Sequence, residues 1–148
     1  MNQAPFDAIP NLTLFLRGDR PNWALVGKRM QLERDLEEVI YEDLLDYATS
    51  SAKSPLSLVV LGPAGYGVST VLMAVAAKLV QDRVGSVFMH KPGSPLQEGD
   101  IEFAASLFPE ECPFFIIDNA PTVPIRLSAL LAGSGMHGAR GCFFSANV

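Results

Sequence analysis

The stretch that most constrains this chain is residues 58–70, which read LVVLGPAGYGVST. It opens with a run of apolar residues, which is typical of a buried strand. Glycines at positions 62, 65 and 67 follow and predict a tight turn. The residues after Gly67 have the spacing of a helix, so the stretch predicts a strand, a turn and a helix N-terminus. Units of this kind build α/β folds around parallel sheets.

The same residues follow the phosphate-binding P-loop pattern G-x-x-x-x-G-K-[ST] with one departure. Gly62 and Gly67 occupy the glycine positions and Ser69 the [ST] position, but Val68 replaces the lysine. Backbone amides and a helix dipole can bind phosphate without any side chain. A charge-assisted hydrogen bond contributes roughly 1.5–3 kcal/mol, so its loss should lower nucleotide affinity by about one to two orders of magnitude.

The loop is therefore expected to hold a nucleotide and to hydrolyse it poorly. The expected nucleotide-binding residues are Gly62, Pro63, Ala64, Gly65, Tyr66, Gly67, Val68, Ser69 and Thr70. The Ser69 hydroxyl is also an expected Mg²⁺ ligand. Glycine-rich turns also join strands to helices where no ligand binds, and the loop alone leaves that alternative open.

A second informative stretch is residues 113–119, which read PFFIIDN. An apolar run that ends in an aspartate predicts a central parallel strand with a carboxylate at its C-terminal tip, the edge where open α/β sheets bind ligands. Asp118 is thus expected to hold Mg²⁺ through its water shell. Asn119 follows, and its amide can orient water but cannot accept a proton.

Composition excludes several functional classes. The 148 residues suit one domain, and the net charge of −5 argues against a broad nucleic-acid surface. No apolar run is long enough for a membrane span and no signal peptide is recognisable, so a cytoplasmic protein is expected. Cys112 and Cys142 are too few for a disulfide framework or a metal site, and both are expected to be small buried residues.

The remaining elements alternate between strands and helices. Further strands are expected at 85–90 and 141–147, and helices at 28–49, 69–83, 101–108 and 125–132. The first helix should bury one face, formed by Leu32, Leu36, Val39, Ile40 and Leu44. Residues 1–24 are expected to be a lead-in and 25–148 the domain. Trp23 either covers the core edge, which we favour, or stacks on an adenine base.

Together these segments resemble the nucleotide-binding core of the AAA+/STAND group within the ASCE branch of P-loop ATPases. Residues 26–32 (VGKRMQL) are similar to its "GRExEL" box, 62–70 to Walker A, 114–119 to Walker B and 145–147 to the end of the sensor-1 strand. The resemblance implies a three-layer αβα domain with strand order 2-3-4-1. It also implies ATP or ADP with Mg²⁺ as ligands, and Asn147 as a residue that reads the γ-phosphate.

The departures from that family lead to three interpretations. With Val68 and Asn119 in place of the lysine and the catalytic acid, the chain is first expected to be a regulatory nucleotide-binding module with weak or no hydrolysis. It also ends before the family's fifth strand and lid, which leaves a sheet edge for residues 12–16, a protein partner or a second copy to cover. The second interpretation is therefore a pseudo-ATPase scaffold that binds no nucleotide.

The third interpretation is an active ATPase that uses a substitute cation. The candidate donors are Lys28, Arg29, Lys91 and Arg140, and their spacing favours none of them.

Overall fold

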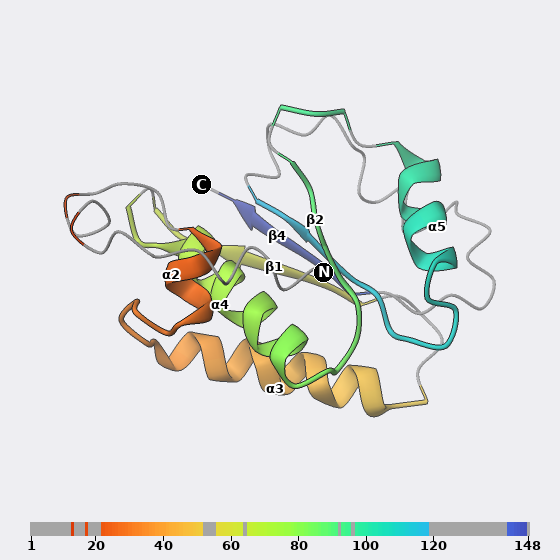
Figure 1. Cartoon of the computed structure of the whole chain (residues 1–148), viewed down its shortest axis with the longest axis horizontal. Coiled ribbons are helices and arrows are strands. Elements are labelled where there is room, and N and C mark those ends of the chain that lie inside the picture. The colour runs from red at the N-terminus through yellow and green to blue at the C-terminus, as the bar shows by residue number, and fades with distance from the viewer. Residues whose placement is uncertain are drawn as a thin grey trace.

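The computed structural model describes residues 13, 17, 22–51, 56–63, 65–91, 93–95, 97–118 and 142–147. They form an α/β fold around a parallel sheet (Figure 1). Its strands are β1 (Leu56–Leu61), β2 (Val87–Met89), β3 (Phe114–Ile117) and β4 (Cys142–Asn147). Their spatial order is β1-β4-β3-β2, which is the predicted order, and every neighbouring pair is parallel.

The last strand in the chain lies in the middle of the sheet. β4 pairs with β1 over its whole length, from Leu56 opposite Cys142 to Leu61 opposite Asn147. On its other side it pairs with β3, where Ile117 lies opposite Ser145. Because all these strands run the same way, their carboxyl ends share one edge of the sheet, and that edge is where ligands bind in open α/β folds.

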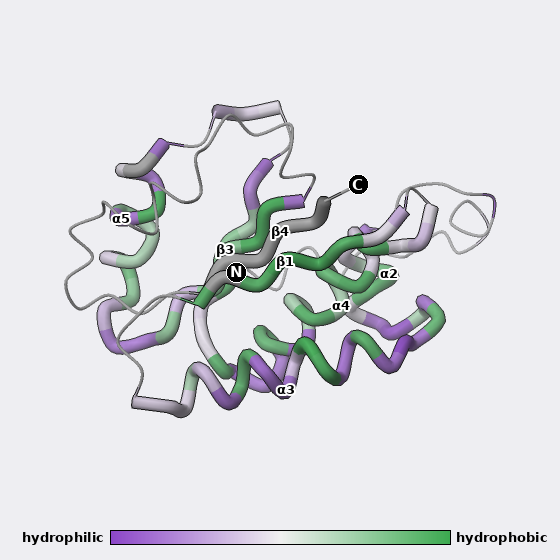
Figure 2. Tube along the Cα trace, turned by 180° about the vertical axis from the view of Figure 1, so that it is seen from behind, coloured by the Kyte–Doolittle hydropathy of each residue, from purple (hydrophilic) through white to green (hydrophobic). Residues whose placement is uncertain are grey.

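Helices pack against both faces of this sheet. They are α2 (Trp23–Gly27), α3 (Asp35–Thr49), α4 (Val68–Gln81) and α5 (Glu98–Ser106). Consecutive residues of a strand point to opposite faces. Phe114 belongs to the main core with residues of α3 and α4, whereas Phe115 packs with Ile101 of α5. Figure 2 shows β1 and β3 as mostly hydrophobic and α3 as a mixture of hydrophilic and hydrophobic residues.

The helix predicted for 28–49 is wrong at its N-terminal end, since α3 begins only at Asp35. The preceding helix α2 ends at Gly27, and Arg29 then takes a left-handed φ of 52°, which interrupts any continuous helix. The apolar face predicted for this helix is also wrong near its N-terminal end.

Leu32 is 83% exposed, and Leu36 and Val39 are also exposed. The buried side chains of α3 are Ile40, Tyr41 and Leu44, so the face that meets the core starts later and includes a tyrosine.

The short helix α2 precedes α3 in the chain and packs against the core. The Asn22 side chain caps it by accepting a hydrogen bond from the Leu25 amide at 2.9 Å. Leu25 and Val26 are fully buried against Met73 and neighbouring residues of α4. Trp23 packs against both core clusters, which confirms its reading as a cover of the core edge.

Several predictions fall on residues outside the described part of the chain. They concern the helix at 125–132, Asn119, Ala64, Arg140 and most of residues 12–16. Within the described part, β1 is an end strand of the sheet and exposes two large apolar side chains, Val59 at 52% and Leu61 at 70%. Cys112 is buried, as expected.

Candidate functional site

The connection between β1 and α4 has the backbone that its glycines predict. Gly65 and Gly67 adopt left-handed φ angles of 85° and 75°, which residues with a Cβ rarely take. Gly67 is also the N-cap of α4, so the left-handed turn leads directly into the helix. The loop therefore wraps around the helix N-terminus, where the positive end of the helix dipole lies.

The amides at the start of α4 are without an acceptor among the described residues. The first hydrogen bond of α4 runs from the Val71 amide to the Gly67 carbonyl at 3.0 Å, so the amides of residues 68–70 precede it. No described residue accepts a hydrogen bond from the amides of residues 67–70. The Tyr66 amide is used within the turn, where it donates to the Pro63 carbonyl at 3.1 Å. This arrangement fits a cradle for phosphate oxygens.

Ser69 and Asp118 meet beside this cradle. Ser69 lies in the first turn of α4, and Asp118 directly follows β3. The Ser69 Oγ donates a hydrogen bond to Asp118 Oδ1 at 2.9 Å, although the two residues are 49 positions apart. A hydroxyl and a carboxylate next to a phosphate seat are the hard oxygen groups that Mg²⁺ takes in nucleotide sites, so these residues fit that ion.

Asn147 reaches the same edge of the sheet through the strand register. It is the last residue of β4 and lies opposite Leu61, the last residue of β1. The structure thus brings the ends of β1, β3 and β4 together, as the resemblance to the family implied. Ala64 and Asn119 lie outside the described residues, so their expected roles stay predictions.

Val68 fills space beside the loop instead of supplying a charge. A Cβ built on Gly62 would lie 2.7 Å from Val68 Cγ2, which is closer than real Cβ contacts allow. Gly62 and the valine side chain therefore approach each other so closely that only a glycine fits. The position that carries a lysine in the P-loop pattern here makes an apolar contact across the loop.

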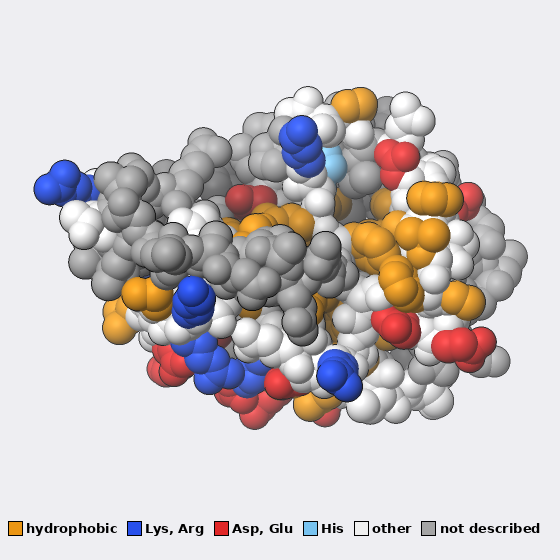
Figure 3. Space-filling view, viewed as in Figure 1, with side chains coloured by type: hydrophobic (Ala, Val, Ile, Leu, Met, Phe, Trp, Pro, Cys, Tyr) orange, Lys and Arg blue, Asp and Glu red, His pale blue; other side chains and the backbone are white. Residues whose placement is uncertain are grey.

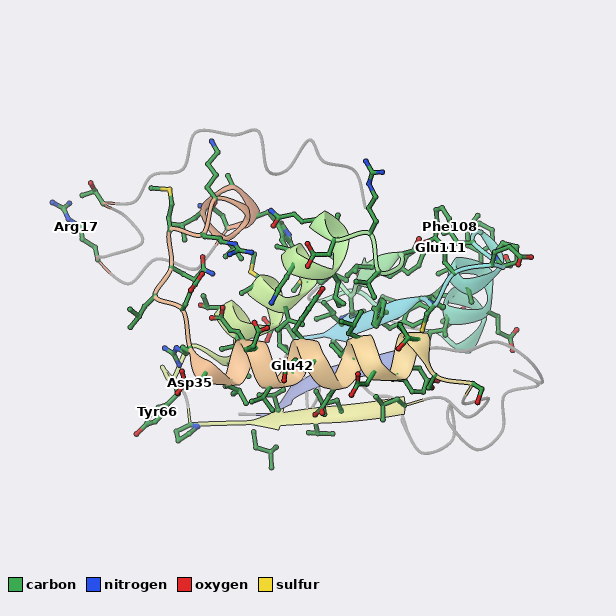
Figure 4. The ribbon with its side chains drawn as sticks, turned by 90° about the horizontal axis from the view of Figure 1, so that it is seen from below. Arg17, Asp35, Glu42, Tyr66, Phe108 and Glu111 are labelled. Atoms are coloured by element: carbon green, nitrogen blue, oxygen red, sulfur yellow. The ribbon has the colours of Figure 1, made fainter. Side chains whose placement is uncertain are left out.

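An arginine that the sequence analysis missed reaches this loop from α3. Arg34 is the N-cap residue of α3, and its Nη1 donates a hydrogen bond to the Tyr66 carbonyl. Its guanidinium also provides the atoms closest to a Cβ built on Gly67, at 2.8 Å. In Figure 4, Asp35, the first residue of α3, and Tyr66 lie at the same end of the molecule. No sequence motif connects positions 34 and 66.

A comparison with protein families agrees with this arrangement. A family model described as novel STAND NTPase 5 matches residues 13–139, which is most of the chain. The chain belongs to this family. The assignment indicates a nucleotide-binding module of the P-loop NTPase type and points to the use of a divalent cation. No curated protein and no solved structure matches the chain.

Two other cations of this STAND NTPase domain are held in ion pairs with glutamates. Arg29 Nη1 lies 3.8 Å from a Glu33 oxygen, and Lys78 Nζ lies 2.6 Å from a Glu38 oxygen. Lys78 also sits 3.9 Å from the centre of the Tyr41 ring. Arg29 and Glu33 lie between α2 and α3, whereas the second pair joins α4 to α3. Figure 3 shows basic and acidic side chains side by side at the lower left of this face.

The STAND domain also has a cavity of about 260 Å³ between its N-terminal helices and α4, which Arg34 borders. Gln31 and Glu37 line it, and each has a buried Oε1 with no hydrogen-bond partner among the described residues. Burial and the nearby Glu33 raise the pKa of the Glu37 carboxyl, and a hydrogen bond with Gln31 opposes this shift.

None of the described helices has the length and apolar character needed to cross a membrane.

Proposed function

We propose that this chain is an ATP-binding module of the ASCE branch of P-loop proteins, with a degenerate Walker A motif and weak or no hydrolysis. It acts as a regulatory switch whose state depends on the bound nucleotide. The loop 62–70 seats the phosphates, Ser69 and Asp118 hold Mg²⁺, and Asn147 reads the γ-phosphate. The domain comprises residues 25–148 behind a lead-in of residues 1–24, and its sheet and helices form the three-layer αβα arrangement of this branch.

The observation that carries the proposal is the 2.9 Å hydrogen bond between Ser69 Oγ and Asp118 Oδ1. A glycine-rich turn that binds no ligand does not require a hydroxyl of α4 to lie beside a carboxylate at the end of β3. The left-handed Gly67 and the open amides of the first helical turn support the same conclusion. All of these groups can act on phosphate and Mg²⁺ without the missing lysine.

The same site is poorly equipped for hydrolysis. Val68 supplies no positive charge to the transferring phosphoryl group, whose charge must be stabilised in the transition state. Asn119 stands where an acidic residue would accept the proton of the attacking water. Binding energy can still select between conformations when turnover is slow, because a ligand shifts a two-state equilibrium by its difference in affinity for the two states.

Isothermal titration calorimetry with ATP and Mg²⁺ tests this proposal, together with thermal unfolding in the presence of nucleotide. A ligand at a hundred times its Kd stabilises the native state by about 2.7 kcal/mol, so a clear rise in Tm is expected. Ser69→Ala should weaken the Mg²⁺-dependent binding. Ser106→Ala is the matched control, because that hydroxyl bonds the Phe103 carbonyl within α5. Absence of both heat and thermal shift at millimolar nucleotide would refute the proposal.

A second candidate function is a scaffold that keeps the fold for protein–protein contact and binds no nucleotide. The exposed Val59 and Leu61 favour it, because they give one face of β1 an apolar surface. Among the described residues β1 is also an end strand, and such a strand can pair with a partner or with a second copy. Light scattering across a concentration series separates the two functions. A monomer that binds nucleotide tightly would exclude the scaffold.

A further inference from the structure

Arg34 is an arginine at the phosphate loop that forms no ion pair within 4 Å with a described carboxylate, although its charge favours the ionised form of Glu37. In the described part of the chain, ion pairs within 4 Å engage Arg29 and Lys78, and Arg34 takes part in neither. Its guanidinium instead contacts the loop, through the Tyr66 carbonyl and alongside Gly67. A positive charge therefore lies on the backbone of the turn that would hold the phosphates.

Position 68 lacks the positive charge that a lysine supplies to the phosphates in the P-loop pattern. The Val68 side chain packs against Gly62, so the site where a P-loop lysine would extend is apolar. We propose that Arg34 is a binding residue for the nucleotide phosphates and supplies the cation that Val68 lacks. This inference rests on the proposed nucleotide-binding function and names one more residue of the same site.

The chemistry of arginine suits this task. A guanidinium has five N–H donors, so Arg34 can keep its bond to the Tyr66 carbonyl while other N–H groups turn to phosphate oxygens. The Arg34 side chain is exposed, which leaves it room to reorient when a ligand arrives. Its backbone is held at the N-cap of α3, whose buried face anchors that helix to α4.

The test compares the Kd for MgATP of the wild type with two substitutions that remove one exposed positive charge each. Arg34→Gln removes the charge and leaves a neutral amide on a shorter side chain, and affinity should fall about tenfold. Arg83→Gln removes the same charge from the turn after the far end of α4 and should change affinity less than about twofold. Arg34→Lys should retain most of the affinity. Circular dichroism confirms that each variant is folded.

A second substitution shows whether the effect lies at the phosphates. Val68→Lys added to Arg34→Gln should restore affinity to at least the wild-type level, because it returns a cation to the P-loop position. If wild type binds MgATP and Arg34→Gln binds it equally well, the role of Arg34 is refuted and the proposed function stands. If neither wild type nor Val68→Lys binds nucleotide, both fail.

Discussion

The contact between Gly62 and Val68 makes the conformation of the loop measurable without any ligand. In Gly62→Ala the new methyl carbon would lie 2.7 Å from Val68 Cγ2. Gly62 does not have a positive φ, so the substitution adds a steric clash and no left-handed strain. Val68 is β-branched and in the first turn of a helix, where its χ1 has little freedom to move away.

Overpacking of this kind costs about 1–3 kcal/mol, which corresponds to roughly 4–8 °C in Tm for a cost near the middle of that range. Removing the obstructing methyls should relieve most of the clash. The substitution Gly62→Ala should therefore destabilise the wild type strongly and the Val68→Ala background only weakly, with a coupling of about 1 kcal/mol or more.

Urea unfolding followed by circular dichroism measures the four proteins of this double-mutant cycle. Gly65→Ala is a useful contrast, because a Cβ there has nothing within 4 Å and its cost should come from the φ of 85° alone. That cost should not depend on residue 68. Strict additivity of Gly62→Ala and Val68→Ala would refute the packing, and with it the description of the loop.

Three further outcomes are expected. Burial, followed by the hydrogen bond to Asp82, raises the pKa of Tyr41 from 10.0 to about 12, so stability should fall as pH rises from 10 towards 12, and Tyr41→Phe should remove this loss in alkaline urea titrations. Because the pKa of Glu37 is raised above 4.5, chiefly by burial, its ionised form opposes folding. Glu37→Gln should thus stabilise the protein at pH 7 in chemical unfolding, with a gain that disappears below pH 4.5, whereas Glu42→Gln on the exposed side of α3 should show no such gain. Asp118→Ala should weaken ATP binding about tenfold or more in the presence of Mg²⁺ and change it little in EDTA, and equal losses under both conditions would contradict a metal-holding role.

The alternation of apolar runs and helical spacing was enough to predict most of the elements. The apolar run before Asp118 predicted a central strand, and the glycines at 65 and 67 predicted the turn because few other residues take positive φ. The order of the strands came from the resemblance to a known family and not from periodicity, since pairing between distant strands leaves no local signal. The start of α3 was predicted wrongly because apolar spacing continues through Leu32, although that side chain is exposed.

The sequence by itself thus determined the phosphate-loop unit, the aspartate that follows the apolar strand and the absence of the usual lysine. Only the tertiary structure decided that the Ser69 hydroxyl meets the Asp118 carboxylate, that Val68 closes against Gly62, and that Arg34 lies on the loop. The first kind of information is local, since it depends on residues that are neighbours in the chain. The second depends on how α3 packs against α4 and where β3 lies in the sheet, and the buried surface that fixes those positions is spread over the whole core.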